Sequence, residues 1–526
     1  MLILEFIQFL PKVLINFIKL KESLMKFRLF IAIILVVLFL LTGNSFAATY
    51  YVATTGDNAA PGTEGEPWRT LKYAADNISN GDTVIVRGGT YHENFRIIKS
   101  NITFQAYTAE TPIIDGNGVL PVDPEGTGYY ALIAVYESGA DLANNVTIDG
   151  FTVRRSTGYG INVYDPWPPS DGSDGVTIKN CEIYQNYNNA VVIGGGAERA
   201  LIEDCEIYTN CMCMVGGYSG EQALCTGGQR PSQVTLRGDD SIMRRCTVRD
   251  SYNEGLNIER YSDNITVEYC QIYGNFQLQL YAVNTTNPTI RYNLIYGTNP
   301  NANGWDGTGE GIYFGNEAQW SQPNVYMNAK VYGNLVANTS NNMWIDGAAD
   351  TLIHNVFMYN NTLIEATINA FRVEGTTGSG HIFKNNIIWQ TDGVIATVPA
   401  GKVTADYNLW SRVPDVDVQG ANDPTYAVPL TSKTTGWTTL TGGSLDGGEF
   451  SLGSASTAVD AGKSLDTVYS KIPDCNVSVW SGAVKLRNQT DQGSGWEIGA
   501  DVHVVDGTSE GEIKEPKTLT IKTSSE

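Results

Sequence analysis

VTIKNCEI at residues 176–183 is followed by ALIEDCEI at residues 200–207, an interval of 24 residues. Strings of the same pattern recur along most of the chain at intervals of 22 to 41 residues. They begin at Val146, Val176, Ala200, Ser241, Ile265, Pro288, Ala329, Thr351, His381 and Val403. A repeat with a shortest unit of 22 to 24 residues is typical of a solenoid, in which each unit packs only on its neighbours.

Apolar residues alternate with polar ones inside each unit. In one unit the apolar members are Val176, Ile178, Cys181, Ile183, Val191 and Ile193. This period of two indicates three short strands and no helix. Because so short a strand cannot bury its apolar face alone, it must stack on its equivalent in the next unit. The sequence therefore predicts an all-β fold, a three-faced parallel β-helix of about 10–12 coils over residues 48–418.

One position of the repeat holds two kinds of side chain in succession. It is occupied by Cys181, Cys205, Cys246 and Cys270, then by Asn293, Asn334, Asn386 and Asn408, with Phe151 and Val356 as exceptions. Identical side chains stacked at the strand spacing explain both runs. We expect the four cysteines to be buried free thiols, because rungs about 4.8 Å apart exceed the ~3.8 Å between the Cβ atoms of a disulfide.

The segment before the repeats carries a family resemblance. Its strings are YYVATTGD (50–57), PWRTLKYAADNI (67–78), GDTVIVRGGTYHE (81–93) and ITFQAY with PIIDG (102–116). They resemble the start of secreted members of the pectate-lyase-like superfamily, and the resemblance extends to about residue 415. It implies a right-handed parallel β-helix. It does not imply one activity, because this superfamily includes lyases, glycosidases, epimerases and non-catalytic surface proteins.

The regions on either side of the repeats are expected to close the solenoid. Residues 68–79 predict a short amphipathic helix over the first turn. Residues 419–505, with GEFSLGSASTAVDAG and GSGWEIGAD, resemble the closing segment of the same secreted proteins and predict a β-rich cap on the last turn. Residues 506–526 are expected to form a polar tail.

The N-terminal residues 1–47 read as a bacterial-type secretory signal peptide. Lys26 and Arg28 precede an apolar run at residues 29–41, and small residues at 45 and 47 resemble a cleavage site. Met25 is a better start for such a signal than Met1. We therefore expect a protein that is secreted or held at the cell surface.

Composition limits the partners. Hydrophobic residues make up 42% of the chain and charged residues 17%, which is globular rather than disordered. The 34 Lys and Arg residues against 56 Asp and Glu residues give a net charge of −22. This charge excludes a general nucleic-acid binder, since phosphate contacts need clustered cations. An extracellular polysaccharide is the expected partner and a monomer the expected state, and a polyanionic chain would need a local basic patch or a bridging cation.

The remaining cysteines, the histidines and the acidic loops bear on other chemistries. We expect Cys211 or Cys213 to bond to Cys225, with Cys475 left over. His354 and His381 are expected to be exposed strand residues outside the candidate site, which leaves a histidine-based triad unsupported. Hard oxygen ligands at residues 171–174, at residues 238–240 and around Asp306 make calcium a possible cofactor, although turn chemistry explains them equally well.

Alternation also predicts which residues point outward on the strand that comes after the Cys and Asn position. The first outward row is Asn162, Val192, Asn257, Tyr281, Tyr313, Trp344 and Arg372. The second row, two residues later, is Tyr164, Gly194, Glu259, Val283, Gly315, Asp346 and Glu374. Long insertions at residues 165–175, 217–239, 297–310 (with Trp305) and 315–328 flank these rows. Aromatic rings beside carboxylates and amides suit sugar rings, so the rows predict a site for an extended glycan.

The chemistry at this face stays open between three alternatives. Arg372 with Tyr281 or Tyr313, assisted by Arg260, is the combination that suits β-elimination from a uronate, and the resemblance slightly favours a lyase. Paired carboxylates suit hydrolysis. The pairs are Asp346 with Glu374, one rung apart, and Glu254 with Glu310, two rungs apart. A non-catalytic surface or adhesion protein is the third alternative.

Overall fold

The computed structural model describes residues 47–117, 131–135, 143–163, 172–215, 231–297, 309–317, 324–347, 352–375, 378–414, 416–424, 456–473, 484–489 and 495–501, with residues 21, 25–28, 31, 452 and 475. The predicted signal peptide lies almost wholly outside these residues, and the predicted tail lies outside them. The chain divides into two units, Met1–Ala48 and Thr49–Glu526, and every strand belongs to the second. In the described part of the chain, no helix is long and apolar enough to cross a membrane.

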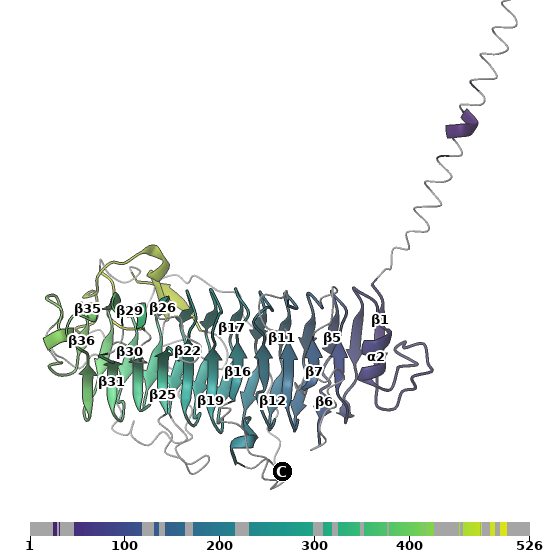
Figure 1. The fold of residues 1–526 in the computed structure, drawn as a ribbon, viewed down its shortest axis with the longest axis horizontal. Helices are drawn as coiled ribbons and strands as arrows, with labels where there is room; N and C mark the ends of the chain where they lie inside the picture. The colour runs from purple at the N-terminus through teal and green to yellow at the C-terminus, as the bar shows by residue number, and fades with distance from the viewer. Residues whose placement is uncertain are drawn as a thin grey trace, which may run out of the picture. The chain divides into compact units, whose positions relative to one another are not determined.

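Three parallel sheets of 13, 12 and 11 strands form the faces of a solenoid, and each coil except those at the two ends contributes one strand to each sheet (Figure 1). Sheet A contains β1 (Thr49–Val52), β2 (Thr83–Val86), β5 (Thr103–Ala106), β8 (Thr147–Asp149), β11 (Thr177–Lys179), β14 (Leu201–Glu203), β17 (Ile242–Arg244), β20 (Thr266–Glu268), β23 (Thr289–Arg291), β26 (Asn324–Tyr332), β29 (Leu352–Tyr359), β32 (His381–Lys384) and β35 (Val403–Asp406). Sheet B contains β3 (Gly89–Tyr91), β6 (Pro112–Asp115), β9 (Thr152–Arg154), β12 (Glu182–Tyr184), β15 (Glu206–Tyr208), β18 (Thr247–Arg249), β21 (Gln271–Tyr273), β24 (Leu294–Tyr296), β27 (Leu335–Ala337), β30 (Thr362–Ile364), β33 (Ile387–Trp389) and β36 (Leu409–Trp410). Sheet C contains β4 (Phe95–Ile97), β7 (Ala131–Val135), β10 (Tyr159–Val163), β13 (Val191–Ile193), β16 (Ser232–Leu236), β19 (Glu254–Ile258), β22 (Leu278–Val283), β25 (Glu310–Gly315), β28 (Asn341–Ile345), β31 (Asn369–Val373) and β34 (Val394–Thr397). The predicted three-faced parallel β-helix is confirmed.

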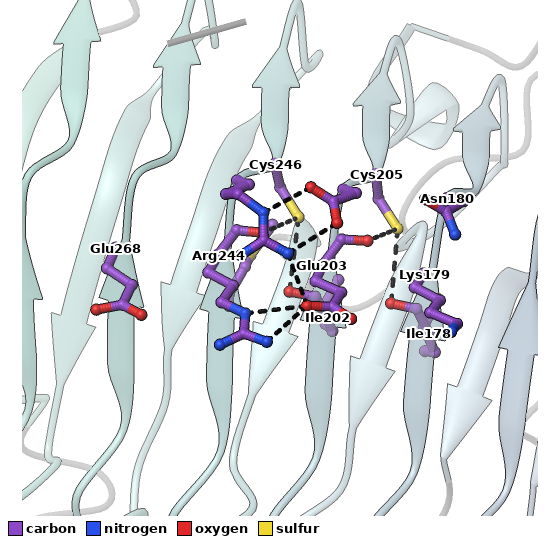
Figure 2. Close-up of polar contacts among 12 residues, drawn as sticks. Ile178, Lys179, Asn180, Ile202, Glu203, Cys205, Arg244, Cys246 and Glu268 are labelled. Atoms are coloured by element: carbon purple, nitrogen blue, oxygen red, sulfur yellow. Dashed lines mark hydrogen bonds and ion pairs between the residues drawn. The ribbon is translucent and has the colours of Figure 1, made fainter. Parts of the chain in front are cut away.

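The predicted file of cysteines runs along the buried side of the corner between sheets A and B. Cys181, Cys205, Cys246 and Cys270 are all buried free thiols, as expected. Each sulfur donates to backbone carbonyls instead of bonding to its neighbour, as Cys246 does to Ile202 and Arg244 at 3.6 and 3.3 Å (Figure 2). Outside the same corner Glu203 pairs with Arg244 at 2.8 Å. The buried side of this corner is therefore apolar, and its outer side carries an ion pair.

The asparagine run continues this file with one difference from the prediction. Asn293, Asn334, Asn386 and Asn408 are buried and linked by side-chain hydrogen bonds, and the member between Asn334 and Asn386 is Asn361. The assignment of Val356 to this position was wrong. Strand β29 (Leu352–Tyr359) is longer than most, and Val356 pairs with Ala329, the first residue of the preceding repeat string. The repeat on β29 therefore begins at Val356 instead of Thr351, which places Asn361 in the ladder.

His381 is buried at the start of β32, so the expectation that it is exposed was wrong. It faces inward, and its Nδ1 accepts a hydrogen bond from the Val356 N–H at 3.2 Å. Its Nε2 has no hydrogen-bond partner. His354, by contrast, is half-buried and stacks on the exposed ring of Tyr326, with 4.6 Å between the ring centroids.

Acid is expected to destabilise the fold through His381. Burial lowers the pKa of this imidazole from 6.5 to about 4, with smaller contributions from His354 and Lys402. The unfolded chain therefore takes up a proton at higher pH than the folded one, so stability is full above pH ~6.5 and falls toward pH ~4, by on the order of 3 kcal/mol. Urea unfolding at pH 7 and pH 4.5 measures this. His381→Gln should show a smaller pH dependence than the unsubstituted protein, and an equal dependence would contradict the assignment.

Helix α2 (Leu71–Asn77) covers the first coil, which confirms the predicted helix over a shorter range. The side chain of Thr70 caps its N-terminus by accepting from the Tyr73 N–H at 3.2 Å. The carboxylate of Glu93 accepts from the Leu71 and Lys72 N–H groups at 3.0 Å each. Leu71 is buried on the inner face of the helix, so the helix shields the apolar core at this end.

The C-terminal segment is placed differently from the predicted cap. Its described residues lie along the flank of the solenoid and contain a small antiparallel pair, β37 (Lys471–Pro473) with β38 (Leu486–Asn488). The Lys471 carbonyl accepts from the Tyr292 hydroxyl at 2.9 Å, and the Ala500 N–H donates to Thr362 Oγ1 at 2.9 Å. The ring of Tyr469 packs against Tyr332 and Tyr359. Beyond the last coil lies instead a 3-10 helix, η3 (Val416–Val418).

Candidate active site on sheet C

The outward face of sheet C carries a row of side chains in register from rung to rung. The row is Asn162, Val192, Thr235, Asn257, Tyr281, Tyr313, Trp344 and Arg372. It confirms the predicted register with one addition. Thr235 lies on β16, inside residues 217–239 that were expected to be an insertion, so the third strand of the coil that contains β14 and β15 was not predicted.

The rings in the middle of this row contact one another. The centroids of Tyr281 and Tyr313 lie 5.0 Å apart, and those of Tyr313 and Trp344 lie 4.9 Å apart in an edge-to-face arrangement. The Arg372 guanidinium sits 4.2 Å above the Trp344 ring, within the range of a cation–π contact. Four successive strands, β22 to β31, thus build one aromatic surface that ends in a cation.

Carboxylates of the second row pair with this surface. The Tyr313 hydroxyl donates to Asp346 at 2.5 Å, and Arg372 pairs with Glu374 at 2.5 Å. The Tyr281 hydroxyl donates to Glu317 at 3.2 Å. Asp346 and Glu374 follow directly after Ile345 and Val373, which are paired across β28 and β31, so the two carboxylates lie one rung apart as predicted.

Both tyrosines are held in the protonated form. Burial is the largest cause of the rise in the pKa of Tyr281 and of Tyr313. The Asp346 carboxylate raises the pKa of Tyr313 further, and Glu317 raises that of Tyr281. Neither phenol therefore ionises by itself near neutral pH, and each can act as a hydrogen-bond donor.

Gly315 leaves space for the Tyr281 ring. A Cβ atom at Gly315 would lie 2.8 Å from the Tyr281 hydroxyl oxygen and 3.1 Å from a Tyr313 ring carbon. Both distances are shorter than ordinary contact. The absence of a side chain in the second row at this rung is therefore what permits Tyr281 to lie across the sheet.

Buried carboxylates occupy an earlier position of the same strands. Glu254 is 5% exposed and accepts from the Ser232 hydroxyl at 2.6 Å, while Glu310 is 1% exposed and accepts from the Asn341 backbone N–H and side-chain amide at 2.8 and 2.7 Å. Leu278 lies between them in register, which confirms the predicted separation of two rungs.

Two family descriptions match the chain. The family described as Pel9A-like, right handed beta helix region, matches residues 50–223, and the family described as right handed beta helix region matches residues 170–349. The crystal structure of pectate lyase Pel9A superposes with a TM-score of 0.50 and 15% identity, covering 88% of this chain and 98% of that one. The chain therefore has the fold of a right-handed parallel β-helix, and its N-terminal part is similar to the Pel9A-like family.

Two curated proteins are also similar to parts of this β-helix chain. Pectate lyase PEL9 of Emericella nidulans is 38% identical over 228 residues, which cover 40% of this chain and 50% of the relative. The uncharacterized protein YwoF of Bacillus subtilis is 30% identical over 138 residues, 25% of this chain and 28% of the relative. The chain thus matches at most half the length of either relative.

The structure brings most of the predicted site residues of this β-helix together. Arg372, Tyr281, Tyr313, Asp346, Glu374 and Trp344 form the aromatic and charged cluster described above. Asn257 lies one rung before Tyr281, whereas Asn162 lies three rungs before Asn257. Trp305 and Tyr164 lie outside the described residues.

Glu259, a predicted binding residue, forms ion pairs with neighbouring arginines. Glu259 accepts from Arg237 at 2.5 Å and from Arg260 at 2.8 Å, so Arg260 is engaged three residues beyond Asn257. The sequence analysis missed Arg237 because it follows the overlooked strand β16. It also missed Ser232, Asn341 and Glu317, which hold the carboxylates and a tyrosine hydroxyl in place.

Metal and disulfide expectations have different outcomes. Over the described ranges, no group of three or more His, Cys, Asp or Glu side chains is arranged to hold a metal ion. Asp171 and Asp306, two of the suggested calcium ligands, lie outside those ranges. Cys213 is disulfide-bonded and Cys211 is a buried free thiol. Cys475 is, as expected, a buried thiol outside a disulfide, and it donates to the Ala500 carbonyl at 3.8 Å. Cys225 lies outside the described residues.

Proposed function

We propose that this protein binds an extended, uronate-containing polysaccharide along the outward face of sheet C and cleaves it by β-elimination. The observation that carries the proposal is the continuous surface of Tyr281, Tyr313, Trp344 and Arg372 on four successive strands. Aromatic rings stack on the apolar faces of sugars, and an arginine at the end of the surface can pair with a carboxylate in two parallel bonds. The similarity to pectate lyases supports the same class of substrate. A polymeric substrate agrees with the secretion expected from residues 1–47.

β-Elimination needs groups for three tasks: one neutralises the carboxylate, one accepts the proton from carbon and one protonates the departing oxygen. A proton leaves the carbon that carries the carboxylate, a double bond forms to the next ring carbon, and the glycosidic oxygen departs with a proton. In this proposal Arg372 neutralises the carboxylate, exchanging part of its contact with Glu374 for the substrate. Because that neutralisation stabilises the developing negative charge, Arg372 acts on the slow proton-abstraction step.

Tyr313 and Asp346 are proposed to accept the substrate proton together. The phenol oxygen takes the proton from carbon as its own proton passes to Asp346 along the existing 2.5 Å hydrogen bond. The raised pKa of Tyr313 means that it needs such a partner to act as a base. Tyr281, which is also protonated, is placed one rung away to donate to the departing oxygen.

Hydrolysis is the second candidate, favoured by Glu254 and Glu310. These carboxylates are two rungs apart, about 9.6 Å between backbones, near the upper end of the ~6.5–9.5 Å range of inverting glycosidases. Their burial on an outward face is unusual for carboxylates that serve only as surface charges.

A polysaccharide panel tests these alternatives. Neutral and uronate-containing chains are incubated with the protein, with and without calcium, and both unsaturated-product absorbance and new reducing ends are followed. Products with both signals support β-elimination, and reducing ends without unsaturation support hydrolysis. Binding without either signal would favour the non-catalytic surface protein.

Arg372→Ala is expected to weaken binding of a uronate chain more than binding of a neutral one, because it removes the cation that pairs with carboxylates. Trp344→Ala should weaken both, by about 1–3 kcal/mol, because it removes a stacking surface. Affinity electrophoresis in gels that contain each polymer measures the two effects. Equal losses on both polymers from Arg372→Ala would shift the assignment to hydrolysis.

A further inference from the structure

Two polar atoms on the outward face of sheet C are buried and have no hydrogen-bond partner among the described residues. They are the Asn257 side-chain oxygen, on β19, and the Trp344 indole nitrogen, on β28. The Asn257 residue as a whole is 7% exposed. An unpaired buried polar atom costs about 1–3 kcal/mol, so such atoms call for an explanation. Neither atom faces the packed core, because both residues belong to the outward row.

The two atoms are of opposite kinds and stand at opposite ends of the aromatic surface. The amide oxygen of Asn257 can only accept, and the indole N–H of Trp344 can only donate. Between them lie the rungs of Tyr281 and Tyr313, so the ends are three rungs apart, or about 14 Å.

The surroundings reinforce this polarity. At the Asn257 end, the amide nitrogen is directed at Glu254, 3.4 Å away, and the nearby cations Arg237 and Arg260 both pair with Glu259. At the Trp344 end, the Arg372 guanidinium lies over the ring and adds further donors. One end of the surface therefore requires hydrogen-bond donors from its ligand, and the other supplies them.

We propose that this face recognises a polysaccharide that contains both neutral sugars and uronates, with a neutral hydroxyl-bearing sugar at Asn257 and a uronate at Trp344 and Arg372. This inference rests on the proposed function and specifies its substrate. A ring hydroxyl of either kind of sugar can donate to the Asn257 oxygen, but a uronate there would bring its ionised carboxylate toward the carboxylate of Glu254, which repels it. A neutral sugar satisfies Asn257 without that repulsion, and the carboxylate of a uronate satisfies Trp344 and Arg372. A homopolymer of uronate therefore places a repelled carboxylate at the Asn257 end.

Two matched pairs of polymers test the inference. Each pair sets a homopolymer against a chain in which the same uronate alternates with a neutral sugar: polygalacturonate against alternating galacturonate–rhamnose, and polyglucuronate against hyaluronate. We expect kcat/KM, or the association constant where no cleavage occurs, to be at least tenfold higher for the alternating member of the pair that is recognised. Equal or higher values for the homopolymer would overturn the inference and leave the proposed function standing. No binding to any of the four polymers would count against the proposed function itself.

Asn257→Leu then tests the residue that carries the argument. This variant keeps the approximate volume but removes the acceptor, and it is expected to reduce the preference for the alternating chain several-fold. Asn257→Ser retains an acceptor oxygen and should preserve more of the preference. Lys330→Ala, on the outer face of sheet A, is the matched control, and thermal midpoints of all variants report folding. An unchanged preference in folded Asn257→Leu would overturn the inference.

Discussion

Tyr313→Phe is expected to lower kcat on a cleaved polysaccharide by at least about a hundredfold and to change KM little. The substitution removes only the hydroxyl that donates to Asp346 at 2.5 Å. The ring remains, with its contacts to Tyr281 and Trp344, so the stacking surface for the sugar is retained. Steady-state kinetics on the best substrate of the panel measures the change.

The exposed Tyr326 offers a matched control for that experiment. Tyr326 lies on sheet A and is 57% exposed. Tyr326→Phe removes its hydroxyl and should leave kcat unchanged. A folded Tyr313→Phe variant with nearly full activity would exclude this hydroxyl from proton transfer. Attention would then move to the carboxylates Glu254 and Glu310.

Asn334→Ala is expected to destabilise the fold by about 3–5 kcal/mol. The Asn334 side-chain oxygen accepts from the Asn293 backbone N–H and side-chain amide at 3.1 and 3.0 Å. Its own amide donates to the Ile290 carbonyl at 2.9 Å and to Asn361 at 3.0 Å. Alanine leaves these buried groups unpaired in a place that water cannot reach without opening the coil.

Urea unfolding of Asn334→Ala, compared with that of Asn77→Ala, measures the loss in the free energy of unfolding. Asn77 lies at the exposed end of α2 and makes one hydrogen bond to the Tyr73 carbonyl, so its loss should cost less than about 1 kcal/mol. Similar midpoints for the two variants would show that the ladder contributes little.

The sequence errors have different physical causes. Val356 was placed in the ladder that Asn361 occupies, and His381 was expected on the surface although it is buried. Val356 pairs with Ala329, so the repeat on β29 begins five residues after Thr351, and the residues that lengthen this strand hide that start. His381 begins its own repeat string, a position that Val176 holds in another coil and that is buried in both. The missed strand β16 has a different cause, because a long insertion preceded it.

The sequence by itself determined that this protein is a stacked β-helix, and it identified the outward row from Asn257 to Arg372. This was possible because alternation is a local property of a strand, and a unit of 22 to 24 residues repeats it. Only the tertiary structure decided which partner each outward residue has. Arg372 pairs with Glu374, Tyr313 donates to Asp346, and the Asn257 oxygen has no hydrogen-bond partner among the described residues. Such pairing depends on side-chain conformation and burial between rungs that are distant in the chain, and it also sets the pKa of each tyrosine.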